Sequence, residues 1–485
     1  MSQAVQNAVP VANDPHRISV KSSSLKRSVL YLAYFFPPRG GAAVQRSLKF
    51  ARYLPDFGWT PLVLANGGTV QDNATKVQDP TLLKELPPDA VVRYTSLTPD
   101  EKRRHDRAQS KFMQRLNVTD PMRWWVQPAI RLGTEMIARH KPEAIVVTMS
   151  PFTAARAGIE LKRRTGLPLV FDLRDPWALD ETRIYPTRWH AWRDWVAMSK
   201  ALAAADLVIM NTPQSAAAVS RAFAREVQGL DGGTPSKVIA ITNGYDASDF
   251  GHGSQPPPPR DVLRIVHTGM FHAELATVWD DVLADRGIVN TIKHARRPIN
   301  LWTRSPRYLL DAMDLVVKRG DIPPGKLELV LVGELTDDDR EMIQRSPVAN
   351  MVQMLGYRSH AESVGWLESG DLLFLPLHTP LDGGPTLIVP GKAYEYLGSG
   401  RPILAMCPEG DMRDFVDKSR SGVIVDGDDV TAAADALARL YRAKLAGETP
   451  VNPDRAAVER FERRHLTGRL AAALDELVDA PRPAA

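Results

Sequence analysis

Hydrophobic residues in this chain occur as short continuous runs separated by longer amphipathic segments. Between residues 29 and 244 the runs are VLYLAY, PLVLAN, VVRYTSL, AIVVTMS, PLVFDLR, LVIMNT and KVIAITNG. Continuous apolar runs are typical of strands that a parallel sheet buries on both faces. Helical patterns lie between them at 42–57, 128–140, 153–165 and 190–204. The pattern predicts a doubly wound α/β domain.

The same alternation restarts after the segment GHGSQPPPPR, whose four consecutive prolines neither continue a helix nor lie inside a sheet. The later runs are LRIVHTG, LELVLVG, VQMLGY, DLLFLPL, PILAMC and SGVIVDG, with helical patterns at 305–319, 360–368, 391–398 and 429–444. We therefore predict a disordered tail at 1–27, a first domain at 28–250, a hinge at 251–260, a second domain at 261–450, and at 451–485 a helix packing back on the first domain, followed by a tail. The carboxyl ends of the two sheets should face one cleft, where open α/β sheets bind ligands.

Composition narrows the class of protein. Hydrophobic residues make up 44% of the 485 residues, and no apolar run approaches the roughly 18 residues of a membrane span. The net charge of +4 is too small to indicate nucleic-acid binding. The single cysteine, Cys407, excludes an internal disulfide and is expected to be a buried thiol. A cytoplasmic protein is expected.

The first candidate loop is YFFPPRGGAAVQR, residues 34–46, directly after the first predicted strand. Gly40 and Gly41 lack side chains, so backbone N–H groups at the next helix start can approach a phosphate or sugar oxygen. The loop is neither a G-x-G-x-x-G fingerprint nor a Walker motif, which disfavours dinucleotide oxidoreductases and nucleoside triphosphatases. A tight turn is the alternative. Arg46 ends the segment as a candidate substrate-binding residue.

A more specific signal is VPGKAYEYLGSGRPIL, residues 389–404. Gly391 suits a first helical turn, but Lys392 puts a cation at the positive end of the helix dipole, which a nearby anion would explain. Glu395 lies nearly one turn further on the same face, where it can accept hydrogen bonds from ribose hydroxyls. The alternative is an exposed ion pair between Lys392 and Glu395. The preceding loop holds Gly383 and Gly384, whose amides are candidates for contacting a diphosphate.

These motifs resemble the GT-B glycosyltransferases, and among them the glycosyltransferase family 4 type of bacterial polysaccharide assembly. The resemblance covers residues 28–445 and is carried, in the family's order, by YFFPPRGGAAVQRSLKFARYLPDFGW, GLPLVFDLRDPW, ADLVIMNT, ITNGYDASDF, IVHTGMF and VPGKAYEYLGSGRPIL. It implies two Rossmann-like domains, the first binding a saccharide, lipid-linked or small-molecule acceptor and the second a nucleotide-diphosphate sugar, with Glu395 on the ribose. It also implies transfer with retention at the anomeric carbon.

In such a reaction the departing diphosphate develops negative charge, so stabilising that charge is the main demand on the site. Lys392, Gly269 in HTGMF and the amides of the glycine loop are the candidates. The leaving phosphate can itself take the acceptor proton. No metal-ligand spacing is visible, so no cofactor is expected besides the nucleotide sugar as co-substrate.

The chain departs from the family pattern at three places. The family often has another glutamate eight positions before the ribose glutamate, where this chain has Leu387, and Asp382 is a candidate substitute. The cleft histidine after the fourth strand is here Ser150, a candidate substrate contact. The usual Arg and Lys after the first strand of the second domain are missing, and Arg304, at the end of an insertion at 272–306, is predicted to replace them.

Two further groups of residues leave alternatives open. Asp172, Arg174 and Asp175 follow a predicted strand, either as substrate-binding residues or as an internal salt bridge with the arginine between two carboxylates. His267 in IVHTG is interpreted as a satisfied histidine rather than a catalyst.

The basic stretch 101–131 interleaves Phe112, Met113, Trp124 and Trp125 with Lys and Arg. It is either a surface that contacts an anionic membrane or a solvated helix with a core tryptophan pair.

The predicted function is a metal-independent glycosyltransferase. A non-catalytic scaffold with the same fold is the alternative, because the missing glutamate and basic pair permit it. A sugar-nucleotide epimerase is a weaker alternative, since it needs acidic and basic residues for proton abstraction in the cleft, and no such set is visible.

Overall fold

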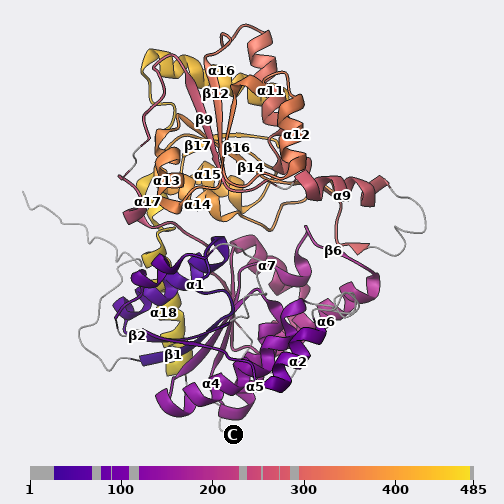
Figure 1. Cartoon of the computed structure of the whole chain (residues 1–485), viewed down its shortest axis with the longest axis vertical. Helices are drawn as coiled ribbons and strands as arrows, with labels where there is room; N and C mark the ends of the chain where they lie inside the picture. The colour runs from indigo at the N-terminus through magenta and orange to yellow at the C-terminus, as the bar shows by residue number, and fades with distance from the viewer. Residues whose placement is uncertain are drawn as a thin grey trace, which may run out of the picture.

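A computed structural model describes residues 27–67, 78–88, 90–108, 120–228, 237–252, 255–271, 273–284 and 294–480. Two parallel sheets stand one above the other along the long axis of the molecule, each with helices packed around it (Figure 1). The predicted α/β architecture of two Rossmann-like sheets is confirmed. The predicted tail falls almost wholly outside the described residues, as does the middle of the 272–306 insertion.

The first sheet has the strand order β3-β2-β1-β4-β5-β7-β8, and all of its pairs are parallel. Its strands are β1 Arg27–Ala33, β2 Trp59–Ala65, β3 Val91–Tyr94, β4 Ala144–Met149, β5 Leu169–Leu173, β7 Leu207–Met210 and β8 Lys237–Ala240. Its helices are α1 Ala42–Tyr53, α2 Pro99–Ala108, α4 Val126–His140, α5 Ala155–Thr165, α6 Arg188–Ala204, α7 Pro213–Ala222 and α8 Ala224–Gln228.

The second sheet has the order β13-β12-β9-β14-β16-β17 and is also parallel. Its strands are β9 Leu263–Thr268, β12 Leu327–Val332, β13 Val352–Gly356, β14 Leu372–Pro376, β16 Ile403–Met406 and β17 Gly422–Val425. Its helices are α9 Ala273–Ala284, α11 Arg307–Lys318, α12 Asp337–Arg345, α13 His360–Ser369, α14 Gly391–Ser399, α15 Asp411–Lys418 and α16 Val430–Ala446.

The continuous apolar runs have a direct structural cause. Along β1, Leu30 and Leu32 belong to one buried cluster, whereas Val29 and Tyr31 belong to a different one. Successive side chains of a strand point to opposite faces, and here helices cover both faces. Every position along the strand is therefore selected for apolar character, and the alternation typical of a half-exposed sheet is lost.

The last helix, α18 Arg463–Asp479, packs against the first sheet beside α1 (Figure 1). The fully buried carboxylate of Asp246 anchors its start, accepting from Arg463 at 3.1 Å and Tyr53 at 2.8 Å. Lys49 forms an ion pair with the same carboxylate at 2.5 Å. Buried charge is tolerated here because each oxygen has a cationic or hydroxyl partner.

Two-residue strands inside the predicted insertion were not expected from the sequence. β10 His294–Ala295 pairs antiparallel with β6 Ile184–Tyr185, which belongs to the first domain. β11 Ile299–Asn300 then pairs with β15 Thr379–Pro380 in the second domain. The end of the insertion therefore crosses from one domain to the other. No hydropathy signal accompanies strands this short.

The aromatic residues of the 101–131 stretch do not form a membrane-facing surface where the structure describes them. Trp124 and Trp125 are buried in the first core, and Trp125 donates to Thr95 Oγ1 at 3.1 Å. The core-pair alternative is therefore correct for both, while Phe112 and Met113 lie outside the described residues. Cys407 is buried, as expected. Across the described ranges, none of the helices combines the length and apolar character that a membrane crossing requires.

Candidate functional site

The start of α14 lies on the side of the second domain that faces the first (Figure 1). Its N-cap is Pro390, and no side chain caps the helix. Gly391 is exposed, and a Cβ placed there would meet nothing within 4 Å. The first amides of a helix have no partner within the helix and carry the positive end of its dipole. This helix start is therefore open to an anion.

Lys392 does not form the alternative ion pair with Glu395. Its Nζ lies 2.7 Å from Nε2 of His267 and 3.4 Å from the carbonyl oxygen of Met270. His267 is buried, and its Nδ1 lies 2.9 Å from the carbonyl oxygen of Phe374. That carbonyl can only accept, so Nδ1 carries the proton and Nε2 accepts from the lysine. His267 is thus a satisfied histidine, as interpreted, and it also positions Lys392.

The surroundings of Lys392 disfavour the protonated form of its amine. Desolvation, followed by the repulsion of Arg304, lowers the pKa of its ammonium group to about 7. Desolvation and the neighbouring lysine hold the pKa of His267 well below its usual value, so the imidazole stays neutral. An anion bound beside Lys392 would relieve the repulsion and favour the protonated amine.

Arg304 is a second cation near Lys392, whose pKa its charge lowers. It ends the short helix Trp302–Arg304, directly before α11. Its guanidinium has no hydrogen-bond or ion-pair partner in the part of the chain that the structure describes. Desolvation lowers its pKa, while the more distant carboxylates of Asp180 and Asp175 raise it. A desolvated cation without a contacting carboxylate is costly unless a ligand supplies the negative charge.

Glu395 completes this group from one turn further along α14. Its carboxylate is partly buried and has no hydrogen bond or ion pair to any described residue. It is therefore free to accept from a ligand, which agrees with the predicted ribose contact. Lys392, Arg304 and Glu395 are hereafter called the donor cluster.

Gly269 leaves room for Lys392. Its φ is +97°, and a Cβ added there would lie 3.1 Å from Lys392 Nζ and 3.3 Å from Cε. Its amide is occupied, since it donates to the carbonyl of Val332 at 2.7 Å. The Gly269 amide is therefore not available to a diphosphate in this structure, and the absence of a side chain at this position leaves space for Lys392.

Gly269→Ala is expected to displace Lys392 and weaken donor binding by about tenfold, in addition to about 1–2 kcal/mol of backbone strain. Gly356→Ala is the matched control, because its φ is +72° but its Cβ would meet nothing within 4 Å. Urea unfolding should show similar losses for both variants, and a nucleotide-sugar titration should show a loss only for Gly269→Ala. Equal donor affinity in the two variants would contradict this role.

The glycine loop differs from its predicted role. Gly384 N donates to Asp382 Oδ1 at 3.0 Å, and Gly383 N donates to Pro380 at 3.3 Å, so both amides are engaged within the loop. Asp382 itself forms an ion pair with Arg297. These contacts assign Gly383, Gly384 and Asp382 to holding the loop, rather than to contacting a diphosphate or a sugar.

On the first domain, Arg46 and Asp172 form a buried ion pair at 2.7 Å. The Arg46 guanidinium also donates to the carbonyls of Ile241 at 2.8 Å and Thr242 at 2.6 Å, so its donors are engaged. Arg174 is not the centre of an internal salt bridge. It donates to backbone carbonyls, including those of Met149 at 3.1 Å and Ser150 at 3.3 Å. The predicted salt bridge between Arg174 and the two carboxylates is therefore wrong, because Asp172 pairs with Arg46 instead.

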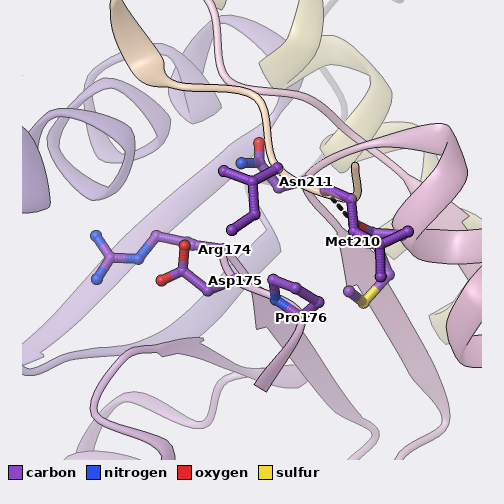
Figure 2. Close-up of a pocket in the computed structure, with 8 residues that line it drawn as sticks. Arg174, Asp175, Pro176, Met210 and Asn211 are labelled. Atoms are coloured by element: carbon purple, nitrogen blue, oxygen red, sulfur yellow. Dashed lines mark hydrogen bonds between the residues drawn. The ribbon is translucent and has the colours of Figure 1, made fainter. Parts of the chain in front are cut away.

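A small pocket lies between the domains at the carboxyl ends of β5 and β7 (Figure 2). Its lining includes Asp175, Pro176 and Asn211 from the first domain and Leu387 and Ile388 from the second. Ser150 and Arg174 follow neighbouring strands, so the predicted acceptor-side residues gather at one sheet edge.

Gly41 is the N-cap of α1, with φ +88°, a conformation that favours glycine. No side chain caps this helix start either. Gly40 is buried directly before it. The turn and an open helix start coexist here, so the two interpretations of this loop do not exclude each other.

Family models match both halves of the chain. The model described as glycosyl transferase 4-like domain matches residues 40–230, and the model described as glycosyl transferases group 1 matches residues 298–443. The chain belongs to the GT-B glycosyltransferases of the 4-like type. The resemblance inferred from its motifs is thereby confirmed, and the protein is a glycosyltransferase.

Solved structures resemble this glycosyltransferase over nearly its whole length. Sucrose-phosphate synthase from Thermosynechococcus elongatus is 12% identical, with 93% of this chain and 99% of that chain covered at a TM-score of 0.59. Anabaena Alr3699/HepE in complex with UDP-glucose is 16% identical, with 93% and 99% covered at 0.52. The E. coli structure titled trehalose-6-phosphate, bound with UDP-2-fluoro glucose, is 12% identical, with 94% and 99% covered at 0.54. At such identities these matches establish the fold. A comparison with curated protein sequences found no match.

Sequence reasoning missed the residues that join the two domains of the glycosyltransferase. Glu181 lies in a loop with no motif, and its partners His378 and Thr386 are about 200 residues further along the chain. Composition and periodicity carry no signal for such a contact. The run PLHTP, a histidine between two prolines after a strand, is the nearest local hint of a structured loop.

Proposed function

We propose that the glycosyltransferase binds a nucleotide-diphosphate sugar through its donor cluster and transfers the sugar, with retention, to an acceptor on the first domain. The observation that carries this proposal is the pair of desolvated cations, Lys392 and Arg304, neither of which contacts a carboxylate of the described residues. They lie beside a helix start with no side-chain cap, and the Glu395 carboxylate, three residues beyond Lys392, has no hydrogen-bond or ion-pair partner among the described residues. This arrangement suits a diphosphate followed by a ribose.

The chemistry follows from where charge develops. As the bond between the anomeric carbon and the phosphate oxygen breaks, the diphosphate becomes more negative. Lys392, Arg304 and the first amides of α14 stabilise this charge more strongly than they stabilise the bound donor. The phosphate oxygen released on the same face takes the proton of the attacking acceptor hydroxyl. No step requires a metal ion.

A uridine nucleotide is the first donor to test. The Anabaena and E. coli neighbours are titled as complexes with UDP-glucose and UDP-2-fluoro glucose, and both resemble this chain in fold. We extend this as a proposal only to the class of donor, a nucleoside-diphosphate hexose. The base and the sugar are what the titration described below would identify.

The acceptor is proposed to be a saccharide, a lipid-linked saccharide or a small molecule that enters beside Asp175. A lipid-linked acceptor would bring the first domain to an anionic membrane surface. The exposed aromatic residues suited to that contact are Trp189 and Trp192 on α6, 50% and 57% exposed, rather than Trp124 and Trp125. Arg193 lies over the ring of Trp189 at 5.4 Å.

Glu395→Ala is expected to weaken binding of the selected donor by about 10- to 100-fold, because two hydroxyl–carboxylate hydrogen bonds are lost. Ligand-observed NMR with uridine, guanosine, adenosine and thymidine diphosphate sugars measures this directly. Glu341→Ala, which removes a 59% exposed carboxylate on α12, is the matched control.

Equal donor affinity in Glu395→Ala and the wild type would contradict the proposed contact between Glu395 and the ribose. Absence of binding by any sugar nucleotide at millimolar concentration would overturn the donor site. The anomeric configuration of the product, compared with that of the donor, tests retention.

A further inference from the structure

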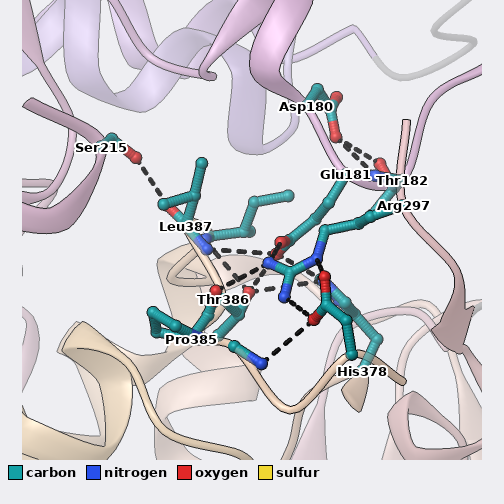
Figure 3. A network of polar contacts seen from close by, with 12 residues as sticks. Asp180, Glu181, Thr182, Ser215, Arg297, His378, Pro385, Thr386 and Leu387 are labelled. Atoms are coloured by element: carbon teal, nitrogen blue, oxygen red, sulfur yellow. Dashed lines mark hydrogen bonds and ion pairs between the residues drawn. The ribbon is translucent and has the colours of Figure 1, made fainter. Parts of the chain in front are cut away.

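A carboxylate of the first domain is inserted into a loop of the second. Glu181 is fully buried, and its Oε1 accepts from His378 Nε2 at 2.8 Å and from Leu387 N at 3.2 Å (Figure 3). The hydroxyl of Thr386 donates to the same oxygen, and Arg297 pairs with Oε2 at 3.1 Å. All four donors belong to the polypeptide beyond the first domain. We call residues 378–388, which connect β14 to α14, the clasp loop.

The segment that carries Glu181 is held rigidly on its own domain. Trp177, four residues before it, donates from Nε1 to Asp194 Oδ1 at 3.0 Å, and Tyr185, four residues after it, donates to Oδ2 at 2.7 Å. Asp194 is fully buried on α6, and Phe152 stacks on Trp177 with centroids 4.8 Å apart. Glu181 is therefore presented from a preorganised support, at little conformational cost.

The first domain also contacts the clasp loop at a second point. The carbonyl of Leu387 accepts from Ser215 Oγ at 2.7 Å and from Thr212 Oγ1 at 3.3 Å, both at the start of α7. The Leu387 side chain packs against the first core. Both backbone groups of one loop residue are thus bonded to the opposite domain.

Arg297 bridges Glu181 and the clasp loop. It contacts Glu181, forms an ion pair with Asp382, and donates to the carbonyl of Pro385 at 2.8 Å. The next residue toward the N-terminus, Arg296, donates to the carbonyl of Ala178 at 2.7 Å. The strand pair β6–β10 lies directly beside these contacts.

The clasp loop leads within a few residues into α14 and the donor cluster. Its Gly383 has φ +73°, a conformation that favours glycine. A Cβ on Gly384 would lie 2.8 Å from the Arg297 guanidinium, so a side chain at this position would interfere with the packing of Arg297 against the loop. When the domains separate, His378, Thr386 and Leu387 lose the acceptor that they share. The backbone of Thr386 stays tied to its own domain, because its N–H donates to the carbonyl of Glu409 at 3.0 Å. The next residue, Leu387, loses the acceptor that its N–H has in this structure.

We infer that Glu181 is a positioning residue that couples closure of the two domains to assembly of the donor site. The inference rests on the proposed donor cluster for its second half. In the closed state Glu181 orders the clasp loop and, through it, the start of α14. By thermodynamic reciprocity, a donor that binds the ordered loop stabilises closure to the same extent.

The test uses the full chain labelled with spin probes at Lys200→Cys on α6 and Arg345→Cys on α12, both exposed. The native Cys407 is fully buried and leaves the labelling specific. Distance distributions are measured for the parent, for Glu181→Ala, for Glu181→Gln, and for the isosteric Thr386→Val on the opposite side of the contact. Glu160→Ala is the control, because among the described residues this carboxylate pairs with Arg163 and Arg164 of its own helix, α5.

Glu181→Ala is expected to shift the distribution to longer distances and raise the apparent Kd for UDP-glucose or GDP-mannose about 10- to 100-fold, because the binding-competent fraction falls. KM should rise more than kcat falls, since saturating donor restores closure. Glu181→Gln and Thr386→Val should lie between the parent and Glu181→Ala. Circular dichroism of Thr386→Val guards against a folding defect.

Unchanged distances in Glu181→Ala would overturn the clasp. Longer distances with unchanged donor affinity would overturn the coupling. If neither nucleotide sugar bound the parent protein, the donor proposal and the coupling would fail together, and the distance measurement would still decide whether Glu181 holds the domains closed.

Discussion

Lys392→Met is expected to lower kcat/KM by about 100- to 1000-fold, the usual cost of removing one preorganised charge from a developing oxyanion. The neutral side chain fills the same space but offers no cation to the diphosphate. Thermal stability should be unchanged or higher. In the native protein the ammonium group has a depressed pKa, so its charge opposes folding near neutral pH, and methionine removes that cost. Differential scanning fluorimetry and initial-rate kinetics measure the two effects.

The protonation of Lys392 should also make donor binding depend on pH. The pKa of Lys392 is lowered to about 7, and the protonated amine is the form that binds an anion. Donor capture by the free enzyme should therefore fall by about tenfold between pH 6 and pH 8 as the proton is lost. His267 stays neutral throughout this range, because its pKa is held well below 6.5.

Lys392→Arg is the informative variant, since its guanidinium remains charged and its kcat/KM profile should be flat between pH 6 and pH 8. A nucleotide sugar is the proper titrant, because its diphosphate diester does not change charge in this range. A wild-type profile that is already flat would contradict the assignment of the titrating group to Lys392.

Arg304→Leu is expected to lower kcat/KM about 100-fold or more, without loss of stability. The guanidinium is desolvated and has no contacting partner among the described residues, so its removal breaks no native ion pair. Arg307→Leu is the matched control. That residue lies three positions further on, is exposed, and stacks over Trp302 at 5.3 Å.

The double variant Lys392→Met/Arg304→Leu tests whether the two cations serve one ligand. If both bind the same diphosphate, the two losses should not add, because the first substitution already misplaces the anion. Full additivity in a double-mutant cycle on kcat/KM would mean that the two residues act at separate places. A lowered melting temperature in Arg304→Leu would indicate a structural role instead.

Local patterns predicted the elements of the fold closely. The expected helices at 360–368 and 391–398 are α13 His360–Ser369 and α14 Gly391–Ser399. Strands buried on both faces leave long apolar runs, and helix starts leave Pro and Gly, so both signals are readable within a few residues. The prediction that Lys392 and Glu395 contact one ligand rests on the same kind of local signal, since about one helical turn brings them to one face.

Contacts between distant segments were not predictable in this way. Asp172, Arg174 and Asp175 lie within four positions of one another, and the sequence alone left open a salt bridge among them or a substrate-binding role. The fold instead brings Arg46 from α1 to Asp172, while Arg174 turns to carbonyls of the neighbouring strand end. Asp382 is the predicted substitute for the missing glutamate, but its carboxylate accepts from Arg297, 85 residues earlier in the chain.

By itself the sequence determined the two parallel sheets, the glycosyltransferase family and the helix that begins the donor cluster, because each depends on periodicity or on residues a few positions apart. The tertiary structure decided which charges are available. Whether a lysine or an arginine pairs with a carboxylate depends on groups far away in the sequence. Only the fold shows that Asp172 pairs with Arg46, whereas Lys392 and Arg304 contact no carboxylate of the described residues.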